Sequence, residues 1–205
     1  MTPEAVAAHF LDVDGGYRFA RWGRAIVPVV FGVDDATLAV VKGAIEAVVS
    51  LSGQGIGETD VEMGANLMLF FVADWDELAA VPDLDGLVPE LGGLLTRLKS
   101  ENASQYRMFR FEADGTIRAA FVFLRMGDAL TDMAAEDLAL AQAVQVILLW
   151  GAAAFAQASP LAMAHGVAVL RPEIAGLIRA AYDPVLPGAS VDASHALRVF
   201  ARMGA

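Results

Sequence analysis

The chain contains no cysteine, and this absence excludes several kinds of chemistry. Without a thiol, the protein can form no disulfide, no thiolate nucleophile, no iron–sulfur cluster and no zinc site with cysteine ligands. Histidine is also scarce, because the chain has only His9, His165 and His195. These three lie in distant segments and form no pair at the spacing of one helical turn. We therefore expect neither a metal site nor any other cofactor.

Positive charge is the second shortage. Lysine and arginine together number 14 against 25 acidic residues, which gives a net charge of -11 and an isoelectric point near 4.6. Nucleic acids and anionic membranes are bound through clustered lysine and arginine, so we expect neither as a partner. The acidic residues are scattered instead of gathered into one run, which is typical of a solvated surface.

The N-terminus, MTPEAVAAHFLDVDGG, lacks both a basic start and an apolar stretch. A secretory signal peptide has both features, so we expect none in this chain. A protein without cysteine is compatible with the cytosol and with the periplasm. The expected location is the cytoplasm, or the periplasm if a leader has been removed.

One long run, Leu138–Ala156, lacks charge altogether and contains no histidine. Its length would suffice for a membrane span. However, much of it is alanine, two glutamines (Gln142 and Gln145) interrupt it, and no basic residue flanks it as a cytoplasmic anchor would. We therefore predict a helix buried in a protein core, and a chain that is not an integral membrane protein.

At 205 residues, the chain has room for one substantial domain. We expect an irregular segment over residues 1–16 and a single α+β domain over residues 17–205. In residues 106–112, the first strand of a predicted hairpin, apolar and basic residues alternate, which predicts one face in the core and one face in contact with solvent. Periodicity and turn residues predict these elements: an edge strand over 25–31, broken by Pro28; a helix capped by Asp34 or Asp35; a central strand over 61–73; a helical stretch over 74–99, interrupted by Pro82 and Pro89; a hairpin of strands 106–112 and 116–124; a helix from Thr131 or Asp132 to about Gln157; and two helices over about 171–182 and 190–203.

Three segments together resemble a bacterial family, domain-of-unknown-function family 2927, whose members look like zincin-type metalloproteases. The segments are Arg21-Trp22 with the strand Ile26–Val29, the strand Asn66–Val72, and the helix and turn Leu177–Gly188, which contain Tyr-Asp-Pro and Pro-Gly. The resemblance implies a zincin-like single domain. Its parts would be a small mixed sheet with a helix, a β-hairpin, a central buried helix and a C-terminal helical pair.

The chain departs from active zincins at the central helix. A catalytic zinc needs about three protein ligands, typically two histidines one helical turn apart with a glutamate base between them. The corresponding segment, Ala141–Gln145, has no histidine, and residues 138–156 contain no carboxylate. A glutamine amide cannot ionise and binds zinc poorly. We therefore assign no catalytic residue and no metal ligand.

Gln142 and Gln145 share one helix face and are candidates for lining a pocket where the metal would sit. Arg179, Tyr182 and Asp183 from the family-like segment are the other candidate pocket residues. The structural alternative is that the glutamine amides bind backbone or arginine partners in the core. For Tyr182-Asp183-Pro184 the alternative is a helix end whose aspartate caps a turn.

Arg21 and Trp22 are candidates for a surface docking site, with a cation–π contact between them. The alternative is that Trp22 packs against the sheet. His195 is expected to be exposed on the last helix. Two acidic groups are candidates for holding a cation. Asp12 and Asp14 resemble the start of a calcium loop, and the alternative is a turn. The alternating Glu58, Asp60 and Glu62 share a face that could raise a carboxylate pKa or hold a cation, and the alternative is a solvated strand edge.

Three functional hypotheses follow. The first is a degenerate, non-catalytic zincin-like domain that binds a peptide or protein partner along the strand beside the central helix. The second is a peptidase with unconventional site residues, which would require His165 or His195. The third is a structural or assembly protein that dimerises through its apolar helix and its C-terminal helices. The sequence leaves the oligomeric state open.

Overall fold

The computed structural model describes residues 1–57, 64–127 and 130–204. The predicted acidic group of Glu58, Asp60 and Glu62 lies outside these ranges. Along the described chain, helices and strands mix in one α+β arrangement, as the sequence predicts. At its centre is a four-stranded sheet with the strands in this order: β2 (Pro28–Phe31), β3 (Leu67–Val72), β5 (Ile117–Arg125) and β4 (Gln105–Phe111).

The sheet is mixed, because β2, β3 and β5 run parallel and β4 runs antiparallel to β5. The predictions of an edge strand at Pro28 and of a central strand after it are confirmed. Proline cannot donate to a ladder, which favours the edge position of β2. The predicted hairpin is also confirmed as β4 and β5, joined at Gly115 in a left-handed conformation (φ 84°).

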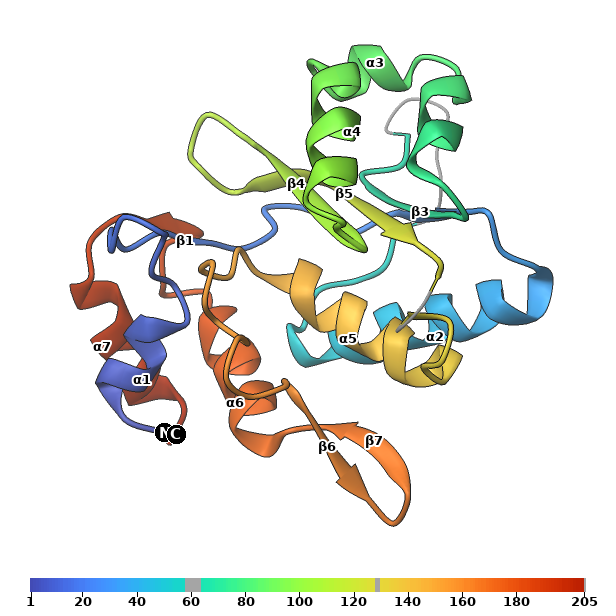
Figure 1. Ribbon diagram of the computed structural model, residues 1–205. Helices are drawn as coiled ribbons and strands as arrows, with labels where there is room; N and C mark the ends of the chain where they lie inside the picture. Colours follow the sequence, from blue (N-terminus) through green and yellow to red (C-terminus); the bar gives the residue numbers. More distant parts are fainter. Residues whose placement is uncertain (58–63, 128–129, 205) are drawn as a thin grey trace.

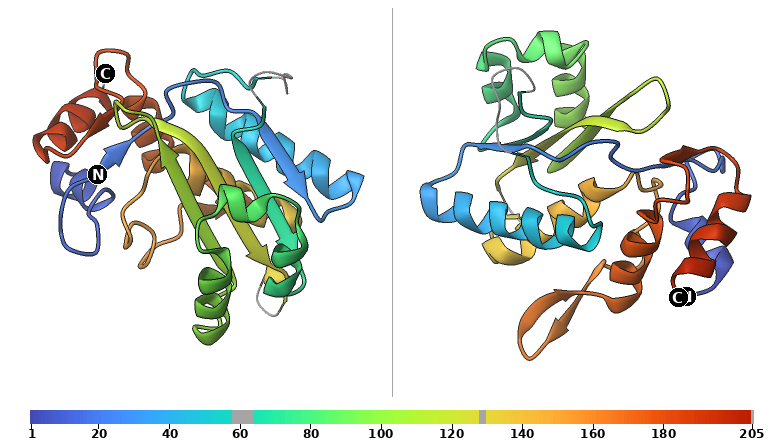
Figure 2. Two further views of the ribbon diagram at one scale, coloured as in Figure 1. Left: turned by 90° about the horizontal axis from the view of Figure 1, so that it is seen from above. Right: turned by 180° about the vertical axis from the view of Figure 1, so that it is seen from behind.

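Helices cover both faces of the sheet (Figures 1 and 2). Side chains of alternate strand residues accordingly enter two separate hydrophobic clusters, for example Leu69 on one face and Phe70 on the other. The expected wet face of the hairpin is therefore wrong, because both faces are covered. On one side lie α2 (Asp35–Leu51) and α5 (Ala135–Ile147), and on the other η1 (Trp75–Ala80), α3 (Leu84–Leu87) and α4 (Leu91–Ser100).

Local capping explains where α2 begins. The Asp34 carboxylate accepts a hydrogen bond from the Thr37 amide at 2.8 Å, so the predicted cap is confirmed. The predicted cap of α5 is wrong. That helix begins after Ala134, which makes no side-chain capping bond, although Glu136 and Asp137 occupy its first turn as expected.

A second group of elements lies beside the sheet and contains both termini (Figure 1). The predicted C-terminal helices are confirmed, but residues 1–16 are not irregular, because they contain a helix that buries Val6 and is followed by the buried Phe10. Helix α1 packs on α7, and a separate hairpin points away from the sheet. The elements are α1 (Pro3–Ala8), β1 (Phe19–Ala20), the hairpin β6 (Leu161–Ala164) and β7 (Val167–Leu170), α6 (Pro172–Ala181), β8 (Ala189–Ser190) and α7 (Ser194–Arg202).

The central helix is shorter than predicted. It ends at Ile147, and Leu148 is already extended, with φ -136° and ψ 160°. The charge-free run therefore divides into a buried helix and an irregular segment. Within the described ranges, no helix has both the length and the apolar character needed to cross a membrane.

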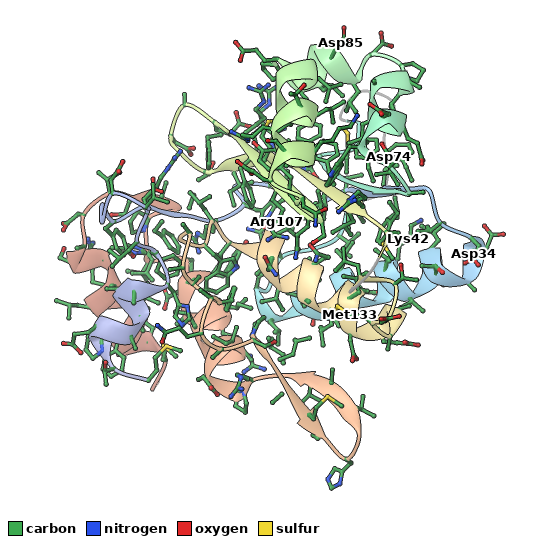
Figure 3. The ribbon with its side chains drawn as sticks, viewed as in Figure 1. Asp34, Lys42, Asp74, Asp85, Arg107 and Met133 are labelled. Carbon is green, nitrogen blue, oxygen red and sulfur yellow. The ribbon has the colours of Figure 1, made fainter. Side chains whose placement is uncertain are left out.

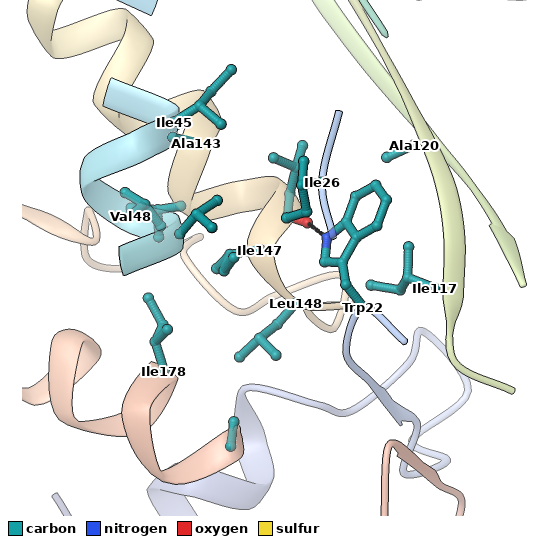
Figure 4. Close-up of a cluster of buried hydrophobic side chains, with 14 of the residues drawn as sticks. Trp22, Ile26, Ile45, Val48, Ile117, Ala120, Ala143, Ile147, Leu148 and Ile178 are labelled. Atoms are coloured by element: carbon teal, nitrogen blue, oxygen red, sulfur yellow. Dashed lines mark hydrogen bonds between the residues drawn. The ribbon is translucent and has the colours of Figure 1, made fainter. Parts of the chain in front are cut away.

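Three side chains, two of them from distant segments, bind the last carbonyls of this helix. The last carbonyls of an α-helix have no partner inside the helix and need donors from elsewhere. Trp150 Nε1 donates to the Val144 carbonyl at 2.7 Å, and Trp22 Nε1 donates to the Val146 carbonyl at 2.8 Å. The Tyr182 hydroxyl donates to the Ile147 carbonyl at 2.7 Å. Figure 4 shows Trp22 inside the cluster that receives this end of α5.

The segment after α5 is held by backbone contacts instead of helical bonds. The Leu149 amide donates to the Ala20 carbonyl at 2.9 Å, and the Gly151 amide donates to the His9 carbonyl at 2.7 Å. Glycine is required here, because a Cβ on residue 151 would lie 2.1 Å from the Leu11 carbonyl oxygen. This close approach holds the segment against residues 9–11.

Candidate functional site

A cavity of about 580 Å³ opens between the edge strand β4 and the segment that follows α5. We call it the β4 groove. Strand β4 forms one wall, and the charge-free segment forms the other. Its lining residues are Asp12, Gln105, Tyr106, Arg107, Phe109, Gln145, Leu149, Trp150, Gly151, Ala152, Ala154, Phe155 and Ala156.

The groove lies along an unpaired backbone edge. In the described structure β5 is the only strand that pairs with β4. The Arg125 amide donates to the Ser104 carbonyl, while the Ala120 amide donates away from β4, to Asn66. Because the hydrogen-bonded pairs of an antiparallel ladder alternate, Gln105, Arg107 and Phe109 direct their amides and carbonyls outward.

The side chains of these same three residues lie on the α5 face of the sheet. Arg107 Nη1 donates to Gln142 Oε1 and to Gln105 Oε1, both at 2.9 Å. Gln142 Nε2 also donates to Gln105 Oε1, at 3.2 Å. Two amides from different elements therefore fix one guanidinium between β4 and α5, where Figure 3 labels Arg107.

Burial changes the acid–base properties of this group. Removal from water lowers the pKa of Arg107 to about 10, because a charged group is disfavoured in a medium of low polarity. The guanidinium still carries its proton at neutral pH. Gln142, by contrast, is neutral and 2% exposed. The result is a fixed positive charge at the floor of the β4 groove.

The two glutamines differ in role. The structural alternative is confirmed for Gln142, whose amide binds an arginine in the core, as described above. Gln145, one turn along the same face, is half-buried and lines the groove. Gln145 is thus a predicted pocket residue that the structure places at the β4 groove.

Aromatic residues shape the opposite wall. Trp150 stacks on Phe10, with 5.6 Å between ring centroids, and packs edge-on against Phe155 at 4.9 Å. His9 contacts both Trp150 and Phe155, and burial lowers its pKa. The turn that follows α1 thereby supports a groove wall that the sequence did not predict.

The other predicted pocket residues form a separate structural cluster. Arg21 donates to the carbonyls of Ala181, Asp183 and Leu186 at 3.0–3.2 Å, and its guanidinium lies 5.5 Å from the Tyr182 ring centroid. Burial raises the pKa of the Tyr182 hydroxyl.

The structural alternative for Tyr182 and Asp183, a helix end whose aspartate caps a turn, is confirmed. Tyr182 ends α6, and the Asp183 carboxylate accepts from the Val185 amide at 2.8 Å and pairs with Arg202 at 2.8 Å. That hydrogen bond and the ion pair lower the pKa of Asp183. Arg179 is exposed on α6. The structure therefore does not bring the five predicted pocket residues together, because Gln145 lines the β4 groove and Tyr182 lines a different cavity of about 590 Å³.

The docking role of Arg21 and Trp22 stays a prediction, because both residues line a cavity of about 590 Å³ that they share with Tyr182. The predicted cation–π contact between the two side chains is wrong. Trp22 is 1% exposed, and Arg21 contacts Tyr182 instead of Trp22. The packing alternative for Trp22 is confirmed. This pair and Tyr182 position the end of α5.

His195 is not exposed as predicted. Its side chain is 0% exposed, and its Nδ1 lies 2.9 Å from the Tyr17 hydroxyl. Burial lowers the pKa of His195 to about 4. His165 is exposed in the β6–β7 turn. Over the described residues, histidine and carboxylate side chains form no group of three that could hold a metal.

Sequence reasoning missed Arg107, although a signal was present. Arg107 alternates in phase with Phe109 and Phe111, so it shares their strand face. A basic residue in phase with two aromatic residues indicates a charge drawn into a covered face. The alternation of apolar and basic residues in this strand instead predicts a solvent-exposed face for the arginine.

Comparisons with known proteins add no assignment. No family model, no curated protein and no solved structure matches this chain. The resemblance to domain-of-unknown-function family 2927 and the zincin-like fold therefore stay predictions.

Proposed function

We propose that this protein is a non-catalytic, zincin-like domain that binds an extended peptide segment of a partner along β4. The observation that carries this proposal is the outward-facing backbone of Gln105, Arg107 and Phe109 beside the β4 groove. An extended peptide can add to such an edge through main-chain hydrogen bonds, while a neighbouring groove selects its side chains.

The order of elements supports the zincin-like part of the proposal. A sheet with a covering helix precedes a hairpin, and the hairpin leads directly into α5, the helix that would carry the metal in an active zincin. The antiparallel strand β4 lies at the edge beside that helix. This is where a zincin-like sheet presents a strand to an extended substrate.

The chemistry of the helix face supports a binding role without catalysis. The positions expected to hold ligands and base carry Ala141, Gln142 and Gln145. Gln142 is bound to Arg107, so a fixed cation lies next to the face where a metal cation would be needed. Like charges repel, so the guanidinium opposes metal binding there.

The test begins with selection of peptides from a displayed library against the purified chain. Bound peptides are expected to slow hydrogen exchange at the outward amides of Gln105, Arg107 and Phe109. The amides of Tyr106 and Met108 serve as the control, because they face β5 and are protected before binding.

N-methylation of the selected peptides provides a second readout. Methyl groups at every other amide should abolish binding, whereas methyl groups in the alternate register should leave it intact. Binding that is insensitive to both registers, or protection confined to other elements, would overturn the proposal.

A second candidate, an assembly role, rests on the projecting hairpin β6–β7. Met163 is 66% exposed, Val167 63% and Val169 38%, an unusual density of exposed apolar side chains. Light scattering should then give a dimer that Met163→Glu disrupts. Val13→Glu, at a site 80% exposed on another element, is the matched control. A monomer at high concentration would remove this candidate.

A further inference from the structure

We infer that the β4 groove selects peptides with an aspartate or glutamate side chain at the position paired with Arg107. This inference rests on the proposed function, because it specifies which peptide the edge strand accepts. It is carried by the geometry of one guanidinium, by its missing counter-charge and by strand pairing.

Arg107 has no ionic partner in the described structure. The ion pairs found there involve other residues, Arg24, Lys99, Arg171 and Arg202. Both contacts to Arg107 come from neutral amides and engage a single atom, Nη1. The positive charge is positioned but not neutralised.

The remaining donors of Arg107 form one free edge. Nε and Nη2 have no protein partner among the described residues, and neither is sealed from solvent. These two nitrogens make the side of the guanidinium that binds a carboxylate through two parallel hydrogen bonds. Arg107 also lines the groove, so this edge is accessible to a ligand there.

The use of glutamine preserves the charge. A glutamate at residue 142 would form a buried ion pair with Arg107 and satisfy it internally. Gln142 has the same shape and reach but no charge, so it orients the guanidinium while leaving its attraction for an external carboxylate intact. Gln105 acts in the same way from β4.

Other charges around the groove leave the site open to an anion. Asp12 is the one acidic residue among the lining residues, and its carboxylate accepts a hydrogen bond from the Val13 amide. Arg18 lines a smaller cavity that shares Asp12, Leu149 and Trp150 with the groove. The groove is thus locally more basic than the chain as a whole, whose net charge is -11.

Strand pairing specifies which group of the peptide meets Arg107. Residues directly opposite each other on neighbouring strands project to the same face of a sheet. The peptide residue opposite Arg107 therefore projects its side chain into the groove beside the guanidinium. Arg107 lies inside β4, with strand residues before and after it, so a paired peptide extends past it in both directions. An internal acidic side chain of the peptide therefore fits better than a terminal carboxylate.

The same register predicts an apolar preference nearby. The peptide residue opposite Phe109 is two positions away from the acidic one and projects to the same face. There it meets Phe109, Trp150 and Phe155, which line the groove. The selected peptides should combine one acidic and one apolar side chain at a spacing of two.

The test uses the selected peptides in pairs that differ only by Glu→Gln or Asp→Asn. A charged hydrogen-bonded contact of this kind changes affinity roughly 10- to 100-fold. Against the wild-type chain, we expect a loss of that size at one peptide position. Against Arg107→Met, the acidic and amide peptides should bind equally.

Gln142→Glu is the second variant, because it supplies an internal carboxylate without removing Arg107. It should remove the preference for the acidic peptide. Thermal unfolding is measured for both variants, and each is used where it remains folded. C-terminal amidation of each peptide tests the other source of a carboxylate and should have little effect.

The outcomes separate this inference from the proposed function. Peptides that protect β4 but show no acid-to-amide difference would overturn the inference and leave the peptide-binding proposal intact. A preference abolished by amidation alone, or kept in Arg107→Met and Gln142→Glu, would also overturn it. An absence of any protection on β4 would overturn the proposed function itself.

Discussion

Replacing Tyr182 with phenylalanine removes one hydroxyl that serves two backbone groups. The hydroxyl donates to the Ile147 carbonyl at 2.7 Å and accepts from the Trp22 amide at 3.3 Å. All three residues are buried. The Tyr182→Phe variant therefore leaves a carbonyl and an amide without partners in a site closed to water.

The magnitude follows from those two groups. Leaving a buried donor or acceptor unsatisfied costs about 1–3 kcal/mol, so for two groups we expect a total loss of about 2–6 kcal/mol in the free energy of unfolding. For a chain of this size, that corresponds to a fall in Tm of roughly 4–24 °C. The end of α5 should also exchange its amide hydrogens faster.

Urea unfolding followed by circular dichroism measures the effect. Tyr106→Phe is the matched control, because the Tyr106 hydroxyl makes no hydrogen bond within the described structure. That control should change stability by less than about 0.5 kcal/mol. A Tyr182→Phe loss no larger than that of the control would refute the argument that side-chain donors from distant segments end α5.

Three further predictions concern the groove wall, the buried histidine and the metal. Gly151→Ala should destabilise the chain by about 1–3 kcal/mol, because its Cβ would meet the Leu11 carbonyl oxygen. Gly43→Ala, in open space on α2, is the control and should stabilise the chain. Urea unfolding of both variants measures the difference, and equal effects would contradict the close approach. His195 has a folded-state pKa of about 4, below its unfolded value near 6.5, so its contribution is present above pH 6.5 and is lost as the pH falls toward 4. The slope of unfolding free energy against pH in that window should be smaller in His195→Gln, and an unchanged slope would count against this assignment. Elemental analysis of protein purified without chelators should find no stoichiometric zinc, and one zinc per chain would contradict the loss of metal chemistry.

Several elements were predictable because their causes are local. Asp34 begins α2 through its own carboxylate, and Gly115 adopts the positive φ that closes the hairpin. The turn of β6 and β7 carried a comparable signal that the sequence argument missed. His165 and Gly166 both have positive φ there, as a two-residue hairpin turn requires.

The candidate site was predictable only in part. The interval Ala141–Gln145 lies on the helix α5 beside the β4 groove, and Gln145 lines that groove. The partner of Gln142 could not be read from the helix, because Arg107 reaches it from a strand 35 residues away. The groove itself depends on a wall that the turn after α1 and the segment after α5 build together.

The sequence by itself determined the order of helices and strands in the core, since capping, turns and periodicity act over a few residues. Tertiary structure decided where α5 stops. No local breaker separates Ile147 from the uncharged residues after it, and the helix ends because Trp22, Trp150 and Tyr182 take its final carbonyls. The same contacts turn the rest of the run into the wall opposite β4. The groove at Arg107 therefore depends on these tertiary contacts.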